Sequence, residues 1–111
     1  MSDEYNSAID FLKVLADPSR LAIIEFLKEG EKTPSEIQDA LKKGQSTISQ
    51  QLKILYQAGV ITGRKEGVNK FYKVKNTAIF GLLKSIFTYL DVEKKEKLDN
   101  LTSSDIKDIL F

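Results

Sequence analysis

The sequence predicts a mainly α-helical fold that contains a single two-stranded β-hairpin. Apolar residues recur at helical spacing through the first half of the chain and again beyond residue 76. Between Val60 and Val74 they alternate with polar residues, which is typical of strands. The 111 residues, 41% hydrophobic and 30% charged, suit one globular domain with a modest core.

The first two helices are predicted over residues 5–16 and 18–28. The first has one apolar stripe, made of Ala8, Phe11, Leu12 and Leu15. Asp17 and Pro18 suit the N-cap and the first helical position of the second helix, and Gly30 is expected to stop it.

The third and fourth helices are predicted to be joined by a short turn at Gly44. Thr33 and Glu36 have the spacing of a capping box, and the helix that they open is expected to bury Ile37, Ala40 and Leu41. The fourth helix is expected to run from about Gln45 to Gly59, with one apolar face formed by Ile48, Leu52, Leu55 and Tyr56. Two helices joined by a glycine-containing turn are typical of a helix-turn-helix.

The β-hairpin is predicted from residues 60–64 and 70–74, around a turn at residues 65–69. A hairpin that directly follows a helix-turn-helix is a wing, so the fold is predicted to be a winged helix-turn-helix. Phe71 and Tyr72 face opposite sides of their strand, and at least one of them is expected to pack on the core.

A fifth helix is predicted from a cap at residues 76–77 to about Leu90. It is apolar on nearly every side, and a chain of this size cannot easily cover such a helix alone. We therefore expect a partner subunit to cover it. This divides the chain into a winged helix-turn-helix and dimerisation domain at residues 1–90 and a C-terminal helical extension at residues 91–111.

The extension is polar until residues 102–105, Thr-Ser-Ser-Asp, which form another capping signal. The signal precedes Ile106, Ile109 and Leu110, so a short terminal helix that docks on its own subunit is expected. A hook onto the partner subunit is the alternative.

The net charge of +1 hides a strong asymmetry along the chain. Residues 1–41 have a net charge of −5, whereas residues 42–75 have a net charge of +7. This asymmetry indicates a surface that binds a polyanion. The alternative is a basic face that is merely solvated.

The outer face and first turn of the fourth helix are predicted to contact DNA. Hydroxyl and amide side chains can read base edges, a lysine can bind phosphate, and the helix N-terminus favours an anion. The predicted residues are Gln45, Ser46, Thr47, Ser49, Gln50 and Lys53. A polar solvent-facing side is the alternative, but such faces usually have acidic residues, and none occurs between Ser46 and Gln57.

The wing is predicted to add Arg64, Lys65 and Lys70 to this surface. Basic residues on a hairpin of this kind can follow a phosphate ridge or enter a minor groove. The neighbouring Lys73 and Lys75 are expected to be only solvated.

Composition argues against several other classes of function. The chain has no cysteine and no histidine, which removes thiolate and imidazole ligands and the commonest catalytic base. We therefore expect no enzyme, no cofactor and no metal site. The acidic start of the chain predicts no secretory signal, and the longest apolar stretch is too short to span a bilayer, so a cytoplasmic location is expected.

Three segments resemble the ArsR-type winged-helix repressors. Residues 11–24 include LADPSRLAII, residues 45–61 include QSTISQQLKIL and AGVI, and residues 67–74 are similar to the wing return of the family. The resemblance covers about residues 9–90. It implies a homodimer with helical dimerisation elements at both ends of the domain, recognition helices in successive major grooves of a palindromic operator, and release of DNA when a ligand binds.

The resemblance also assigns the first and fifth helices to the dimer interface. The residues that this implies are Ala8, Phe11, Leu12, Leu15, Ile79, Leu82, Leu83, Ile86, Phe87 and Leu90. The metal-sensing pattern of the family does not match, because its cysteines are absent and only Asp91 and Glu93 stand near the last-helix ligand positions. Gln50 and Gln51 stand where members of the family have arginine and histidine. The base preferences of those members therefore cannot be assigned to this chain.

The sequence thus predicts a homodimeric regulator, most simply a repressor, that binds double-stranded DNA at a specific palindrome and does not sense metal in the usual way. Its effector is not predicted. Two alternatives remain open: a weakly specific architectural protein that coats DNA, and a winged-helix module that binds another protein through its apolar fifth helix.

Overall fold

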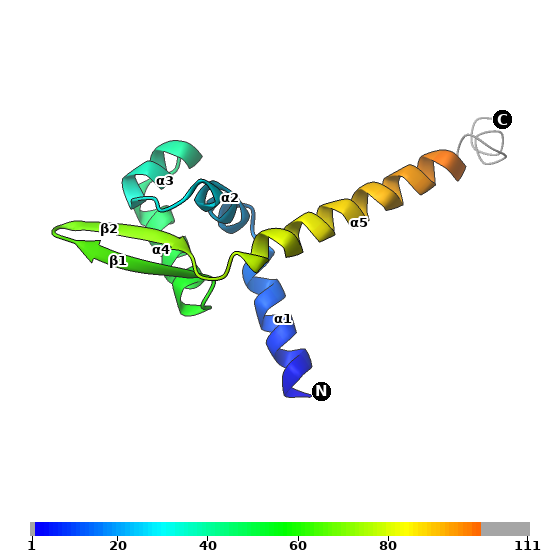
Figure 1. Cartoon of the computed structure of the whole chain (residues 1–111), viewed down its shortest axis with the longest axis horizontal. Helices are drawn as coiled ribbons and strands as arrows, with labels where there is room; N and C mark the ends of the chain where they lie inside the picture. The colour runs from blue at the N-terminus through cyan, green and yellow to red at the C-terminus, as the bar shows by residue number, and fades with distance from the viewer. Residues whose placement is uncertain (1, 101–111) are drawn as a thin grey trace. The chain divides into compact units, whose positions relative to one another are not determined.

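The computed structural model describes residues 2–100 of the chain, without the side chains of residues 98–100. These residues form helices and one two-stranded antiparallel hairpin, which confirms the predicted fold class (Figure 1). The elements in chain order are α1 (Asp3–Leu15), α2 (Pro18–Phe26), the 3₁₀ turn η1 (Leu27–Glu29), α3 (Pro34–Leu41), α4 (Gln45–Gln57), β1 (Ile61–Glu66), β2 (Asn69–Val74) and α5 (Ala78–Asn100). The chain divides into two compact units, one ending at Thr77 and the other beginning at Ala78.

The predicted caps of α2 and α3 are confirmed. Asp17 accepts a hydrogen bond from the Arg20 N–H at 3.1 Å, and Pro18 occupies the first helical position. Thr33 accepts from the Glu36 N–H at 3.2 Å while Glu36 accepts from the Thr33 N–H at 3.0 Å, which completes a capping box. These caps fix where the two helices begin and therefore which of their faces turn inward.

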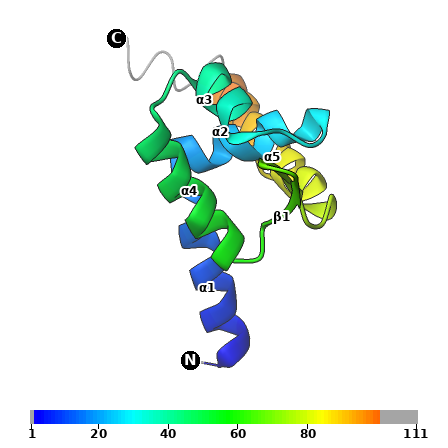
Figure 2. The same ribbon diagram turned by 90° about the vertical axis from the view of Figure 1, so that its left-hand side faces the viewer.

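The turn between α3 and α4 differs from the prediction (Figure 2). Gly44 was expected to break α3, but α3 ends at Leu41 because Lys42 adopts the left-handed conformation, with φ of 55°. Gly44 instead provides the N-cap of α4 in an extended conformation. A left-handed lysine is uncommon, since its Cβ crowds the backbone.

The core of the first unit is built from branched aliphatic side chains. The largest of its fully buried side chains are Ile23, Ile24, Ile37, Ile48, Leu55 and Ile61. Two residues of α3 and α4 that were expected to be buried are not. Ala40 is exposed, because the inward face of the short α3 consists of Ile37 and the half-buried Leu41. Tyr56 is 56% exposed, because it lies one position beyond the inward-facing Leu55.

The hairpin is longer and its turn tighter than predicted. The strands pair from Ile61 with Val74 to Glu66 with Asn69, which leaves only Gly67 and Val68 in the turn. Gly67 has φ of 63°, as a type II′ hairpin turn requires of its first residue.

The hairpin is also tied to the segment before α3. The Tyr72 N–H donates to the Lys32 oxygen at 2.8 Å, and the Lys32 N–H donates to the Tyr72 oxygen at 3.0 Å. Two strands alone are marginally stable, so this additional pairing helps to hold the hairpin in place.

The second unit is described by α5, which continues past the predicted end at Leu90 to Asn100. Ile79 and Leu83 are buried, whereas Leu82, Ile86, Phe87 and Leu90 are 37–49% exposed. Within residues 2–100, no helix is both long and apolar enough to cross a membrane. The expected terminal helix at residues 102–110 lies outside the described residues.

Candidate nucleic-acid interface

The outer face of α4 has the orientation that the sequence predicts. Ile48 and Leu52 are 0% and 3% exposed and anchor the helix to the core. All the side chains assigned to DNA contact on this helix are exposed: Gln45, Ser46, Thr47, Ser49, Gln50 and Lys53. The face therefore presents hydroxyls, amides and an ammonium group to an external partner.

Gln51 has a structural role that separates it from Gln50. Its Oε1 accepts a hydrogen bond from Nη1 of Arg20 at 2.9 Å, and Nε of the same arginine donates to the Val14 oxygen at 2.7 Å. Arg20 thus links the end of α1 to the middle of α4 and fixes the orientation of α4. The amide of Gln51 is directed inward, whereas Gln50 lies on the exposed face.

The N-terminus of α4 makes no side-chain capping hydrogen bond. Its N-cap residue, Gly44, has no side chain, and no acidic residue occurs in the first turn. The first N–H groups of the helix therefore remain available to an outside acceptor, and the helix dipole favours a negative one. This adds to the anion preference of the exposed face.

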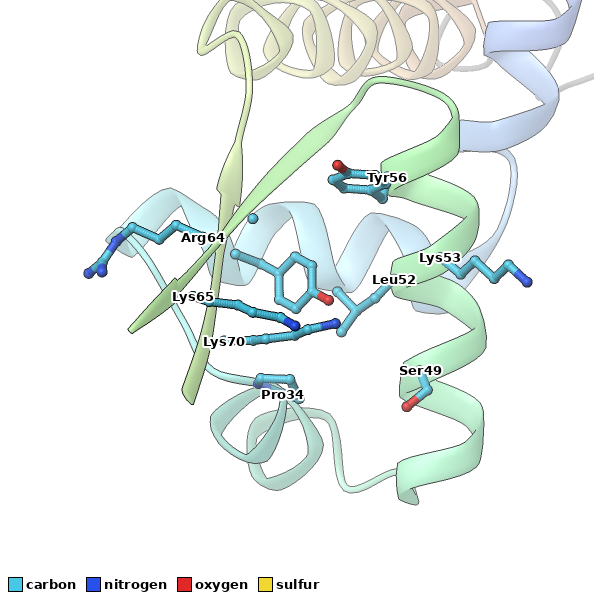
Figure 3. Close-up of a pocket in the computed structure, with 10 residues that line it drawn as sticks. Pro34, Ser49, Leu52, Lys53, Tyr56, Arg64, Lys65 and Lys70 are labelled. Atoms are coloured by element: carbon cyan, nitrogen blue, oxygen red, sulfur yellow. The ribbon is translucent and has the colours of Figure 1, made fainter. Parts of the chain in front are cut away.

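An open groove of about 580 Å³ separates α4 from the hairpin (Figure 3). Lys65 and Lys70 lie directly opposite each other in the strand register, so their side chains share one face. Both point toward α4 in Figure 3. The groove is lined by Pro34, Ser49, Leu52, Lys53, Tyr56, Gly63, Arg64, Lys65, Lys70 and Tyr72. Three lysines around one open groove create a positive potential that suits the phosphates of a nucleic-acid strand.

Some residues that line the groove were not predicted. Gly63 lies opposite Tyr72, and a Cβ at position 63 would come within 3.1 Å of the tyrosine ring. This glycine allows the ring to lie close to β1, and a glycine inside an alternating strand is a signal of such close approach. No local sequence pattern predicts that Tyr56 and Pro34 line the groove, because their positions beside it depend on how α3, α4 and the hairpin pack together. The two aromatic residues of β2, Phe71 and Tyr72, are both half-buried.

Arg64 lies in a different environment from the lysines of the wing. Although Arg64 borders the groove, it pairs with Phe71 in the strand register, on the face opposite Lys65, and Figure 3 shows its side chain extending away from α4. Its guanidinium forms ion pairs with Glu31 at 2.9 Å and with Glu66 at 2.8 Å. These hydrogen bonds raise the pKa of Arg64 further, and the bond from Arg64 is the largest cause of the lowered pKa of Glu31.

Cysteine and histidine, the ligands of cysteine- and histidine-based metal sensors, are both absent from the sequence. Within the described residues, no group of three or more acidic side chains is placed to hold a metal ion.

Comparison with known proteins identifies the family. A model of bacterial regulatory proteins of the arsR family matches residues 17–62, from the cap of α2 to the start of β1. An HTH-type transcriptional regulator of Methanocaldococcus jannaschii is 38% identical over 85 residues, which are 76% of this chain and 96% of that protein. The chain belongs to the ArsR family of DNA-binding transcriptional regulators.

Solved structures that resemble this ArsR-family protein support the family assignment. The transcriptional repressor BigR from Xylella fastidiosa has a TM-score of 0.69 and 30% identity, covering 80% of this chain and 96% of BigR. A homodimeric winged helix-turn-helix DNA-binding domain from Mycobacterium bovis has a TM-score of 0.72 and 25% identity, covering 82% of this chain and 88% of that domain. The winged helix-turn-helix fold is thereby confirmed, and the relatives are DNA-binding regulators rather than enzymes.

Proposed function

We propose that this ArsR-family protein is a sequence-specific repressor that binds a palindromic DNA site as a homodimer. The observation that supports this most strongly is the continuous surface formed by the exposed face of α4 and the lysine-lined groove beside it. One part of this surface can read bases, and the other can neutralise phosphates. The name of the BigR relative supports repression as the outcome.

We assign general affinity for DNA and selection of the base sequence to different residues of this surface. Lys53, Lys65 and Lys70 bind phosphates, because point charges on flexible stems neutralise a backbone without reading its sequence. Thr47, Ser49 and Gln50 read base edges in the major groove, where an amide can bond adenine through two hydrogen bonds. Gln45 and Ser46 lie at the N-terminus of α4 and position this end of the helix on the sugar-phosphate backbone of the DNA.

Dimerisation is proposed to use apolar side chains of α1 and α5. Leu12 is 55% exposed and Ala8 is also exposed, and α5 exposes five large hydrophobic residues from Leu82 to Leu90. Exposed apolar patches on a small protein mark interaction surfaces. The implied residues Leu15, Ile79 and Leu83 are buried in the single chain and would support the interface from within, while Phe11 is half-buried. The Mycobacterium bovis neighbour is itself homodimeric.

The regulator is proposed not to sense metal through thiolates or imidazoles. The absence of cysteine and histidine from the sequence supports this. Any effector is therefore expected to be recognised by other chemistry.

Two alanine substitutions on α4 test whether base reading and phosphate binding are separate roles of different residues. Gln50→Ala is expected to cost about 1–3 kcal/mol of binding free energy on the preferred sequence and to relax preference at one base position. Lys53→Ala is expected to weaken binding to every sequence and to reduce the salt slope by about one. Both are measured by fluorescence anisotropy on labelled duplexes over a range of salt concentrations. Equal losses on all sequences for both variants would contradict the proposal.

The two alternatives give different outcomes in the same measurement. An architectural protein would bind the preferred and scrambled duplexes almost equally, and Gln50→Ala would then have no sequence-dependent effect. A protein-interaction module would not bind duplex DNA even at low salt. The exposed apolar side chains of α5 are the only feature of the described residues that favours this second alternative.

A further inference from the structure

The guanidinium of Arg64 makes several polar contacts and one aromatic contact on the face of the hairpin opposite Lys65 and Lys70. Its Nε donates to both carboxylate oxygens of Glu31, at 3.0 and 3.1 Å, and Nη2 lies 2.9 Å from Glu31 Oε2. Nη1 donates to Glu66 at 2.8 Å, and the guanidinium lies 4.5 Å from the centre of the Phe71 ring. A planar guanidinium that is bonded on several edges and stacked on a ring has a defined position, unlike a single surface ion pair.

The partner of Arg64 belongs to the same segment that pairs with β2. Glu31 is followed by Lys32, whose backbone forms both hydrogen bonds with Tyr72. One short segment before α3 therefore holds the wing twice, through a side chain on β1 and through the backbone of β2. The opposite face of the same strands presents Lys65 and Lys70 to the groove.

From these contacts we propose that Glu31 and Arg64 form a clamp that positions the wing on DNA, so that Arg64 is a positioning residue and not a phosphate contact. This inference rests on the proposed function, because the clamp acts through the lysines assigned to DNA. With the clamp closed, the hairpin is held at the angle at which Lys65 and Lys70 face the groove. With the clamp open, these lysines lose their common orientation.

The charge balance around Arg64 argues against a direct role on phosphate. Two carboxylates already surround the one guanidinium, and with Lys73, which also acts on Glu31, the charges in this cluster balance instead of leaving Arg64 as an unpaired cation. To reach a phosphate, Arg64 would have to leave four short N–H···O contacts and its aromatic stack. Among the described residues, neither Lys65 nor Lys70 forms an ion pair, and both lie on the groove side.

A charge exchange tests the clamp while the net charge stays constant. Arg64→Glu is expected to weaken binding to the selected duplex about tenfold. The double variant Glu31→Arg/Arg64→Glu restores the ion pair in reverse, and its affinity is expected to return to within about threefold of the wild-type value. The matched control Glu31→Arg/Lys75→Glu has the same net charge and alters an exposed lysine that is not assigned to DNA, but it cannot form the clamp, so it is expected to remain about tenfold weaker.

Two further readouts separate positioning from phosphate contact. When Arg64→Gln is added to a Lys65→Ala/Lys70→Ala variant, in which the lysines positioned by the clamp are absent, it is expected to leave the salt slope of binding unchanged, whereas loss of a direct phosphate contact lowers the slope further, by about 0.9. In the free protein, the single variant Arg64→Gln is expected to accelerate hydrogen exchange at the Lys32 and Tyr72 amides, which requires no DNA. A wild-type protein that ignores duplex DNA would overturn the proposed function, and the exchange rates would still report on the clamp. Failure of the charge exchange to rescue binding beyond the control, or a further reduction of the salt slope when Arg64→Gln is added to the Lys65→Ala/Lys70→Ala variant, would overturn the inference.

Discussion

Glu31 and Glu36 are two carboxylates whose pKa values are lowered by different partners. For Glu31 the largest cause is the hydrogen bond from Arg64, and for Glu36 it is the backbone hydrogen bond from Thr33. A carboxylate with a lowered pKa in the folded state stabilises that state above its unfolded pKa, near 4.5, and the contribution is lost as pH falls through the folded pKa. Both contacts are therefore expected to be intact at neutral pH and to open in acid.

These two carboxylates provide a paired prediction. Arg64→Gln is expected to raise the pKa of Glu31 toward its ordinary value while the pKa of Glu36 stays low. Thr33→Ala removes the side-chain hydroxyl but keeps the backbone N–H, so it is expected to raise the pKa of Glu36 only in part and to leave that of Glu31 low. Carbon-detected NMR titration of the side-chain carboxyls measures both values in each variant. If Arg64→Gln left the pKa of Glu31 unchanged, the ion pair seen in the structure would not persist in solution.

Single residues on α4 could be placed from the sequence, whereas those of the wing could not. The helical period fixes which side of α4 faces inward, so the burial of Ile48 and Leu52 also fixes the exposure of Gln50. The partners of Arg64 depend on an approach between segments 33 positions apart, and no local pattern encodes that approach. The contact of Tyr72 with Gly63 likewise depends on the strand register, which the sequence does not specify.

The elements themselves were predictable, and their ends were less so. The fifth helix was expected to end where its apolar residues end, but α5 continues through a charged stretch that includes Glu93 and Lys97 at the helix-stabilising spacing i, i+4. The hairpin turn was expected to occupy residues 65–69, but a glycine at the first turn position permits a two-residue turn. The predicted end of α5 and the predicted extent of the hairpin turn were both wrong because intrinsic backbone preference, and not burial of apolar residues, decides where these elements end.

The turn between α3 and α4 gives a prediction about stability. Lys42→Gly is expected to raise the free energy of unfolding by about 1 kcal/mol, because glycine adopts the left-handed conformation without the Cβ penalty. The matched control is Lys43→Gly, which removes the same charge at a residue without positive φ. This control is expected to lower the free energy by roughly 0.5 kcal/mol through backbone entropy. Urea denaturation measures both, and a loss of stability in Lys42→Gly would contradict the turn geometry.

The assembly of the whole molecule depends on the exposed apolar side of α5. Phe87 is 49% exposed. Phe87→Asp is expected to produce a monomer, because an unpaired carboxylate buried in an apolar interface is costly. The neighbouring variant Thr88→Asp adds the same charge on the polar side of the helix and is expected to remain dimeric. Sedimentation equilibrium distinguishes the two, and a dimeric Phe87→Asp would place the interface elsewhere.

The charge distribution of the molecule was the feature that the sequence predicted best. The basic middle third, with its net charge of +7, contains α4 and the hairpin, which together form the proposed DNA surface. The sequence could not predict that one of those cations would be neutralised by Glu31 from the acidic first third.

The central claim is that two copies of this chain read a symmetric DNA site through α4. Selection of bound duplexes from a random pool by the purified protein tests it most directly. We expect an inverted repeat whose half-sites are one helical turn, roughly 34 Å, apart. A pool with no enriched motif, or one enriched for a single unrepeated half-site, would contradict it.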